Sequence, residues 1–428
     1  MIKAIPRFVW PVALALAALK LFLLVHLNPG LEWNYDERRN GRIADNYLAG
    51  RGYVSYDATR QQWRPDAFHA SFPVFVYVAW QQAGLPKHRF TLLVFALTIA
   101  TYLLGALYVQ RTLAYFGVAP PLAWAGAGLW AVYPSVVYYV GAHFWYENLA
   151  LPLLILVVYK LLRLVGGRPL GWADTLIITS AVTLSCLLRG YLLAVYGLLF
   201  VALLLLCWRV GGAKLRRSAL MLSLLTLGLV VAAHLPILQK NHQLFGAYML
   251  SNQGGFELLQ GHNSSTVGRF MYDWDEPASA FGEYVQAHIP NLRDLNQYQE
   301  SQARAHLATY WVQTHPGAEL RLWLRKTALF FSPENFISDA EPTFYHPVNA
   351  VVHLAFLGAI LLTISRYRGL RFQRRDLLLL LPLLVAWLLS IVFFVGFRWR
   401  YFAEPAMIMF PLIVWQRLKS EMAKRPSC

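Results

Sequence analysis

The chain has 428 residues, of which 57% are hydrophobic and only 14% are charged, and its mean hydropathy is +0.42. Soluble domains carry about 25% charged residues, so this composition excludes an ordinary soluble protein and indicates a polytopic membrane protein. The net charge of +16 is also typical of nucleic-acid-binding proteins, but the placement of the basic residues argues against that class. The three cysteines show neither a disulfide framework nor metal-ligand spacing.

The apolar segments predict an all-α fold with about ten transmembrane helices, each close to the length of about 20 residues that crosses a bilayer. We expect these spans at 8–27, 89–110, 118–140, 144–162, 173–189, 190–208, 218–239, 346–365, 377–396 and 400–416.

The basic residues between the predicted spans indicate the orientation of the chain. One set of connections is almost purely basic, as at Arg216-Arg217 and Arg374-Arg375, whereas two long loops on the opposite side carry more acidic than basic residues. Because Lys and Arg are enriched in cytoplasmic loops, we expect both termini in the cytoplasm and both long loops outside. The expected domains are a membrane region at 1–240 with about seven helices and the outer loop 30–88, an outer segment at 241–345, and a membrane region at 346–428 with about three helices and a cytoplasmic tail.

The outer loop at 30–88 begins with an acidic pair, Asp36 and Glu37, which is followed by two arginines. The segment from Asn34 to Gly50 predicts an amphipathic helix that lies at the membrane surface, with Asn34 as its cap. A carboxylate in the first turn of a helix stays ionised because the free N–H groups favour negative charge. Such a group accepts a proton from an attacking hydroxyl or holds a divalent cation such as Mg²⁺ or Mn²⁺. The alternative is that the pair consists of ordinary helix-start residues.

Several arginines are expected on the outer side, against the usual charge bias, and therefore need a local partner. A guanidinium binds phosphate through two parallel hydrogen bonds, so a phosphate is the natural partner. The alternative is contact with lipid headgroups by snorkelling. These arginines include Arg39, Arg64, Arg189, Arg398 and Arg400.

Other polar residues accompany these arginines. Glu147 stands at the outer start of a predicted span, where a buried carboxylate is costly without a partner. It is either the structural partner of an arginine or part of the site. His69 and His262 have no metal-like spacing, and each is interpreted first as a hydrogen-bonding loop residue. The short apolar piece at 71–78 predicts a second interfacial or re-entrant element.

Together these residues resemble the GT-C superfamily of membrane glycosyltransferases, specifically the bacterial lipid A aminoarabinose transferases and the protein O-mannosyltransferases. One departure concerns the basic-Pro-Pro segment of the family, because here Pro65 is followed by Asp66, which becomes a candidate second acid. The likeness rests on the acidic pair with Gly50-Arg51-Gly52-Tyr53, on Arg64-Pro65 ahead of Phe72-Pro73, on Tyr133-Pro134 before Glu147, on Gly261-His262-Asn263, and on Arg400-Tyr401 before Pro405.

The resemblance implies a glycosyltransferase whose donor is a sugar on a polyprenyl phosphate, such as undecaprenyl phosphate. The acceptor would be a cell-envelope glycan, lipid or protein at the periplasmic face of a bacterial inner membrane, and the segment 241–345 would form the acceptor platform. Asp36, or Glu37 in its place, would act as the base, and arginines would stabilise the lipid phosphate as it leaves. A single displacement would invert the anomeric centre.

The residues expected to bind substrate are Arg39, Arg64, Asp66, His69, Glu147, Arg189, His262, Asn263, Arg398, Arg400 and Tyr401. A second interpretation is a transporter or flippase of a lipid-linked or amphipathic substrate. It predicts charged residues and broken helices in the middle of the membrane, whereas the charges here cluster toward the outer side. A third is a polysaccharide polymerase or ligase with a diphosphate-linked donor.

Overall fold

The computed structural model describes residues 35–57, 60–69, 71–136, 146–270, 279–335, 344–345 and 347–424, together with 14–15, 17–18, 21–22 and 26. Side chains are described at these positions except at 35–37, 210, 334–335, 344–345 and 397–398.

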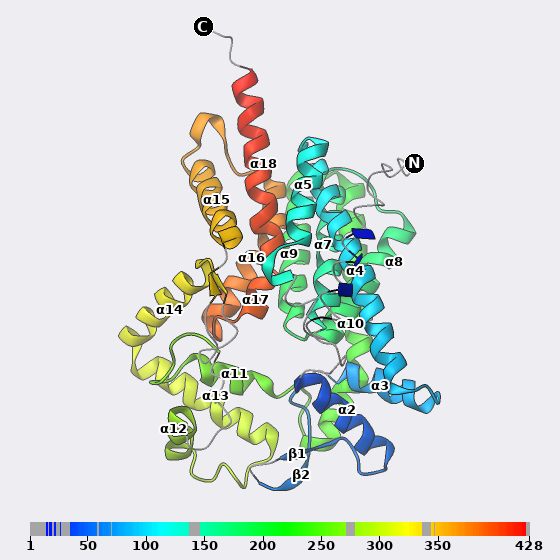
Figure 1. Cartoon of the computed structure of the whole chain (residues 1–428), viewed down its shortest axis with the longest axis vertical. Helices are drawn as coiled ribbons and strands as arrows, with labels where there is room; N and C mark the ends of the chain where they lie inside the picture. Colours follow the sequence, from blue (N-terminus) through cyan, green and yellow to red (C-terminus); the bar gives the residue numbers. More distant parts are fainter. Residues whose placement is uncertain are drawn as a thin grey trace.

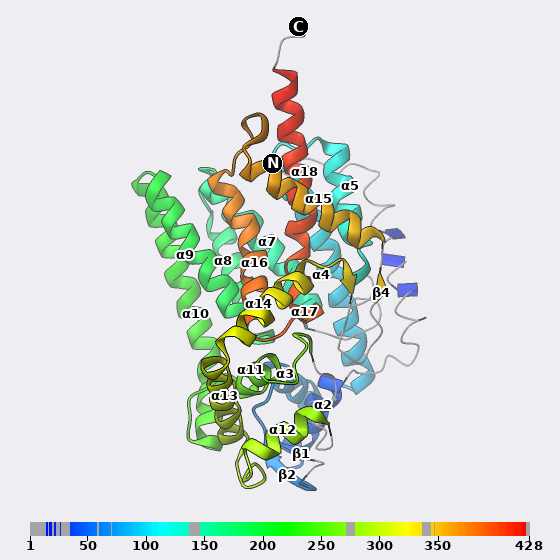
Figure 2. The same cartoon turned by 90° about the vertical axis from the view of Figure 1, so that its left-hand side faces the viewer.

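Six helices in this described part of the chain are long and apolar enough to cross a membrane. They pack into one bundle with three further helices, α5 (Pro120–Ala131), α8 (Trp172–Leu188) and α18 (Glu404–Ala423) (Figures 1 and 2). The expected all-α, multi-pass membrane fold is therefore confirmed. The six helices are α4 (Lys87–Tyr115), α7 (Glu147–Val165), α9 (Leu192–Val210), α10 (Ala213–Phe245), α15 (Pro347–Ile364) and α16 (Arg374–Val392).

Helix α7 forms the centre of the bundle. In the most apolar stretch of α7, 72% of the residues are buried inside the protein, whereas the corresponding share in α10 is 28%. Helix α10 therefore lies at the periphery of the bundle. Small residues allow close packing around this centre. A Cβ atom at Gly105 of α4 would lie 2.6 Å from the ring of Trp130, so only glycine lets α4 and α5 approach this closely.

Two predicted spans are not fully covered by the described residues, and a third differs from the structure. The predicted span 8–27 lies mostly outside the described residues, and so does the end of the span expected at 118–140, of which α5 is the first part. At 400–416 the chain forms two helices, α17 (Phe397–Tyr401) and α18, in place of one. Pro405 lies in the first turn of α18, where a residue without a backbone N–H begins a helix well but does not continue one.

The region predicted to lie outside the membrane, called the outer region below, collects segments from both long loops. It lies at the end of the bundle opposite to the C-terminal end of α18 (Figures 1 and 2). The first loop supplies α2 (Tyr35–Leu48), an antiparallel hairpin of β1 (Val54–Asp57) and β2 (Gln62–Pro65), and α3 (Phe72–Gln82). The second supplies α11 (Gln253–Gly261), α12 (Ala280–His288), α13 (Gln297–Thr314), α14 (Pro316–Phe331) and the paired strands β3 (Glu334–Asn335) and β4 (Phe344–Tyr345).

Helix α2 is the amphipathic helix that the sequence predicted at 34–50. It buries Ile43 and Ala44 and exposes Arg38 and Arg42. The chain leaves it through Gly50, whose φ of 76° is a left-handed conformation that glycine adopts readily. The hairpin that follows was not anticipated from the sequence.

The second outer loop has a small apolar core of its own, built from α11, α12 and α13. Leu259, Phe281 and Ala308 are fully buried in it. A Cβ atom at Gly255 would lie 1.9 Å from the carbonyl oxygen of Ser301, so α11 and α13 are in backbone contact at this glycine.

Candidate active site

The acidic pair lies in the first turn of α2, at the entrance to the outer region. The backbone of Asp36 and Glu37 is helical, one turn before Arg39 and Asn40, and the side chains of the pair lie outside the described residues. The free N–H groups of this turn favour an ionised carboxylate there. The role of Asp36 or Glu37 as the base is therefore a prediction that rests on the position of the pair in the helix.

Arg39 and Asp66 form a buried ion pair beside this turn. The Nε atom of Arg39 donates to Oδ2 of Asp66 at 2.9 Å, and the guanidinium lies 4.7 Å from the centroid of the Phe68 ring. Asp66 is 1% exposed, and its Oδ1 accepts the backbone N–H of Phe68 at 2.9 Å. Burial opposes ionisation of Asp66, but the Arg39 charge and hydrogen bonds from Ser55, Arg39 and Phe68 hold its pKa below the usual range. Asp66 is thus an ionised carboxylate whose two oxygens both accept hydrogen bonds from protein groups.

Lys240, near the outer end of α10, lies next to this pair and was missed by the sequence reasoning. Its Nζ atom donates to Oγ of Ser71 at 2.8 Å and lies 3.5 Å from the centroid of the Tyr53 ring. Tyr53 and Ser71 are both buried, and burial raises the pKa of Tyr53 well above its ordinary value, so the phenol is neutral. The only sequence signal was a lysine two residues after the end of an apolar run.

Arg64 lies in the contact between the two outer loops. It donates to Asp57 at 3.0 Å and to the carbonyl oxygen of Leu295, and its Nη1 lies 4.0 Å from Glu300. Arg60 bonds to Asp57 at 2.7 Å and to the carbonyl oxygen of Leu292 at 2.5 Å. Arg64, expected to bind phosphate, therefore joins the hairpin to the start of α13.

Glu147 and Arg189 form a second buried ion pair, at the outer starts of α7 and α9. Two contacts of 2.9 Å join the guanidinium to the two carboxylate oxygens, and the residues are 1% and 8% exposed. Of the two alternatives for Glu147, this geometry favours the structural partner of an arginine.

Arg400, Tyr401 and Glu404 lie at the same level of the bundle and are all buried. Arg400 donates to the carbonyl oxygen of Ser332 at 2.7 Å and lies 4.0 Å from Oε1 of Glu404. Glu404 also accepts the hydroxyl of Ser135. Arg398 lies in α17, and its side chain is outside the described residues.

His262 and Asn263 connect the second outer loop to the bundle. Nδ1 of His262 lies 2.9 Å from Oε1 of Glu319, and Nε2 lies 2.6 Å from the carbonyl oxygen of Val392. Asn263 donates to the carbonyl oxygen of Leu259 at 2.7 Å and accepts the N–H of Ser265 at 2.7 Å. Through these contacts His262 holds the second outer loop against α14 and the end of α16, and Asn263 stabilises the turn after α11.

His69 is half-buried, with its ring edge against Phe68 at a centroid distance of 4.9 Å. Within the described ranges, no three His, Cys, Asp or Glu side chains lie close enough to hold a metal ion. The side chains of Asp36 and Glu37, which suggested Mg²⁺ or Mn²⁺, lie outside those ranges.

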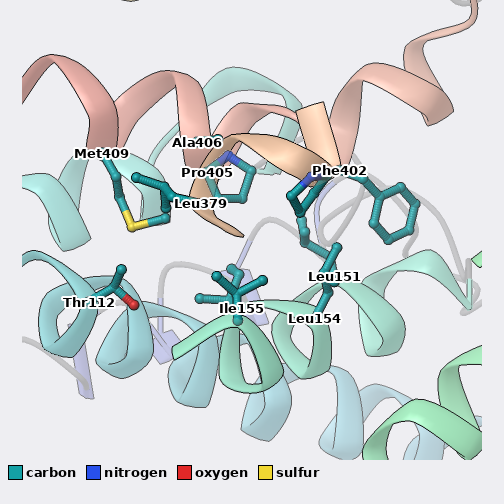
Figure 3. Close-up of a pocket in the computed structure, with 11 residues that line it drawn as sticks. Thr112, Leu151, Leu154, Ile155, Leu379, Phe402, Pro405, Ala406 and Met409 are labelled. Atoms are coloured by element: carbon teal, nitrogen blue, oxygen red, sulfur yellow. The ribbon is translucent and has the colours of Figure 1, made fainter. Parts of the chain in front are cut away.

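An apolar cavity lies between α4, α7, α16 and α18, within the bundle (Figure 3). Leu151, one helical turn after Glu147, and Phe402, directly after Tyr401, are among its lining residues. One end of the cavity therefore lies close to the buried charged residues Glu147 and Arg400. Thr112 is the polar residue among those that line it.

No family model and no curated protein matches the chain. The fold is similar to a solved structure of the archaeal oligosaccharyltransferase AglB from Archaeoglobus fulgidus in complex with an inhibitory peptide and a dolichol-phosphate, with a TM-score of 0.50 and 12% sequence identity. The match covers 98% of this chain and 52% of that one, so the chain spans about half the length of the archaeal protein. A likeness at this identity concerns the fold. The resemblance read from the motifs is therefore confirmed at the level of the fold: the chain has a membrane-helix fold similar to that of this archaeal protein.

Proposed function

We propose that this protein is a membrane glycosyltransferase that moves a sugar from a polyprenyl-phosphate donor to a cell-envelope acceptor. The observation that carries the proposal is the GT-C-like fold, combined with an acidic pair in the first turn of α2 at the outer end of the bundle. The archaeal oligosaccharyltransferase structure contains a dolichol-phosphate and a peptide, which supports a lipid-phosphate donor and a separate acceptor.

In the proposed reaction, Asp36 or Glu37 removes the proton from the acceptor hydroxyl as that oxygen attacks the anomeric carbon. The bond from this carbon to the phosphate oxygen breaks, and the polyprenyl phosphate leaves with the bonding electron pair. Positive charge near the leaving phosphate stabilises it. One displacement inverts the anomeric centre, and general base catalysis contributes about 10²–10⁴-fold to the rate.

The side chains of the outer region have two proposed roles. Arg39 and His69 would face substrate beside α2, and Arg398 stays a proposed substrate-binding residue. Arg64, Asp66, Glu147, Arg189, Arg400 and Tyr401 would position the site through their contacts, while His262 and Asn263 would hold the acceptor platform at 241–345 against the bundle. The reaction would take place at the periplasmic face of a bacterial inner membrane, with both termini in the cytoplasm, as the positive-inside distribution of Lys and Arg supports.

The test is sugar transfer by the purified full chain from a panel of undecaprenyl-phosphate sugars to cell-envelope acceptors. We expect turnover, with the anomeric configuration of the product opposite to that of the donor. Turnover only with diphosphate-linked donors would overturn the donor assignment, and retention of configuration would overturn the single displacement. Absence of transfer, together with movement of the lipid across vesicle membranes, would replace the enzyme with a transporter.

A further inference from the structure

Helix α14 of the second outer loop has an exposed apolar stripe. Leu320, Trp323 and Leu324 are 57%, 43% and 65% exposed, and their spacing of three and four residues places them on one stripe of the helix. Arg321 and Arg325 are also exposed and form a second row, one helical turn apart, beside this stripe. A continuous row of large apolar side chains on a surface marks a site of contact with another apolar surface.

Another face of α14 is fixed to the protein, and this sets the direction of the stripe. Oε1 of Glu319 lies 2.9 Å from Nδ1 of His262, the residue after α11. Nζ of Lys326 donates to the carbonyl oxygens of Ile391 and Phe393, at the end of α16, at 2.8 and 2.6 Å. Glu319 and Lys326 are at most 3% exposed. Because buried groups hold this face against the bundle, α14 cannot turn its apolar stripe inward.

The second half of α14 lies beside the spanning helices α15 and α16. Oγ1 of Thr327 accepts the indole N–H of Trp387 at 3.2 Å, and the carbonyl oxygen of Phe331 lies 3.0 Å from Nδ1 of His353. Trp387 is five residues before the end of α16 and His353 is six residues after the start of α15, which is about 8 to 9 Å into each helix. The exposed stripe ends at Leu324, one turn before Thr327. It therefore lies where the apolar layer of the bilayer meets the headgroups.

The stripe also continues the lipid-facing surface of the bundle. Helix α14 runs along the edge of the molecule between α13 and α15 (Figure 1). On α15, Val351, Leu354 and Leu361 are 67%, 69% and 66% exposed, and exposed apolar side chains of a spanning helix face acyl chains. The arginines beside the stripe match the charge of lipid phosphates, which a guanidinium binds through parallel hydrogen bonds. Leu and Trp on one face with Arg beside them are typical of a helix in the membrane interface.

We propose that α14 is an interfacial helix that binds the membrane leaflet next to the outer region. Leu320, Trp323 and Leu324 lie among the acyl chains, and Arg321 and Arg325 bind the phosphates of anionic phospholipids. The helix has 16 residues, about 24 Å at 1.5 Å per residue, which is less than the apolar thickness of about 30 Å, so it lies in the interface and does not cross. This contact is independent of the reaction proposed above, because it depends only on the membrane fold and on the exposed face of α14.

The first experiment uses the wild-type chain in nanodiscs of phosphatidylcholine and phosphatidylglycerol. Trp323 of α14 and Trp63 of β2 have nearly equal exposure in the isolated chain, 43% and 47%, but β2 lies at the far end of the outer region from the bundle (Figures 1 and 2). Hydroxyl radicals generated in the water should therefore oxidise Trp63 several-fold faster than Trp323, as read by mass spectrometry. Equal rates of oxidation would overturn the proposal.

The second experiment identifies lipid as the occupant. A fluorophore is attached to Leu324→Cys in a Cys428→Ser background, where the remaining Cys186 and Cys207 are buried. Lipids with a nitroxide on the acyl chain quench a fluorophore that lies among those chains, so we expect strong quenching at 324. The matched control is Ala287→Cys, an exposed position on α12 that should be quenched several-fold less. If a second copy of the chain covered the stripe instead, quenching at 324 would be no greater than at 287, which would overturn the proposal.

The third experiment tests the arginines with the same fluorophore at 324. Nitroxide-labelled phosphatidylglycerol should quench with an apparent affinity about fivefold or more above that of nitroxide-labelled phosphatidylcholine, because basic residues attract anionic lipid. Arg321→Gln with Arg325→Gln should bring the ratio of the two affinities close to one. The matched control is Arg216→Gln with Arg217→Gln, which removes two exposed arginines at the start of α10 and should retain the ratio. Equal affinities with all four arginines present would overturn the assignment of anionic phospholipids.

Discussion

Two groups of charged residues lie toward the predicted outer side of the bundle, and they differ in how far they are closed to solvent. The balanced group, formed by Glu147, Arg189, Arg400 and Glu404, has two basic and two acidic residues, all at most 8% exposed. In the open group, formed by Arg39, Asp66 and Lys240, Asp66 is buried, whereas Arg39 and Lys240 are half-buried. A closed group of paired residues serves to hold helices together, whereas a partly open group leaves its side chains within reach of other contacts.

The largest expected effect concerns the balanced group. Glu147→Gln leaves the buried guanidinium of Arg189 without its counter-ion, so we expect the free energy of unfolding to fall by about 3–5 kcal/mol. Thermal unfolding of the purified protein measures this loss. The double variant Glu147→Leu with Arg189→Leu should recover part of it, because both charges are removed together.

The matched control for this prediction is an exposed pair. Lys424 and Glu421 are 2.8 Å apart, with side chains 70% and 40% exposed, so Lys424→Ala should change stability by only about 0–1 kcal/mol. A Glu147→Gln protein as stable as the Lys424→Ala protein would contradict the structural role of the balanced group.

The next effect is pH-dependent and belongs to the open group. Asp66→Asn removes the buried carboxylate that accepts the hydrogen bond from Arg39, and we expect a loss of about 3 kcal/mol at neutral pH. Because the folded protein holds the pKa of Asp66 below the unfolded value of about 3.9, the stability that Asp66 contributes is complete above that value and declines as the pH falls through the folded pKa. The difference between wild type and variant should therefore shrink below about pH 4. Unfolding measured across this range checks the sign, and a difference that grows in acid would contradict it.

The smallest effect on stability is expected at Lys240. Lys240→Met removes the contacts with Ser71 and Tyr53, and this loss is offset because an ammonium group no longer has to be held in a half-buried position. We expect the stability of the lipid-free protein to change by no more than about 1 kcal/mol. A loss as large as that of Glu147→Gln would place Lys240 with the structural charges and remove the distinction between the two groups.

The sequence predicted what depends on local pattern. The apolar runs predicted the membrane helices, and Asn34 to Gly50 predicted α2, because helix periodicity and glycine exit signals act over a few residues. The interruption between α17 and α18 also had a local signal in Pro405, which the span prediction overlooked.

The pairing of side chains could not be predicted in the same way. Glu147 meets Arg189 across 42 residues, and Lys240 meets Ser71 across 169. Such contacts are set by helix packing, which no local pattern encodes. For this reason Arg64 and Asp66 were expected to bind substrate although the fold pairs them with protein groups, and Lys240 was missed although it is placed beside them.

The central claim is that a carboxylate of α2 activates the acceptor at this outer site. The most direct measurement is the rate of sugar transfer by Asp36→Asn and by Glu37→Gln, with undecaprenyl phosphate binding measured on the same preparations. We expect one of the two variants to lose about 10²–10⁴-fold in transfer rate while its binding of undecaprenyl phosphate is unchanged. Transfer at the wild-type rate by both variants would contradict it.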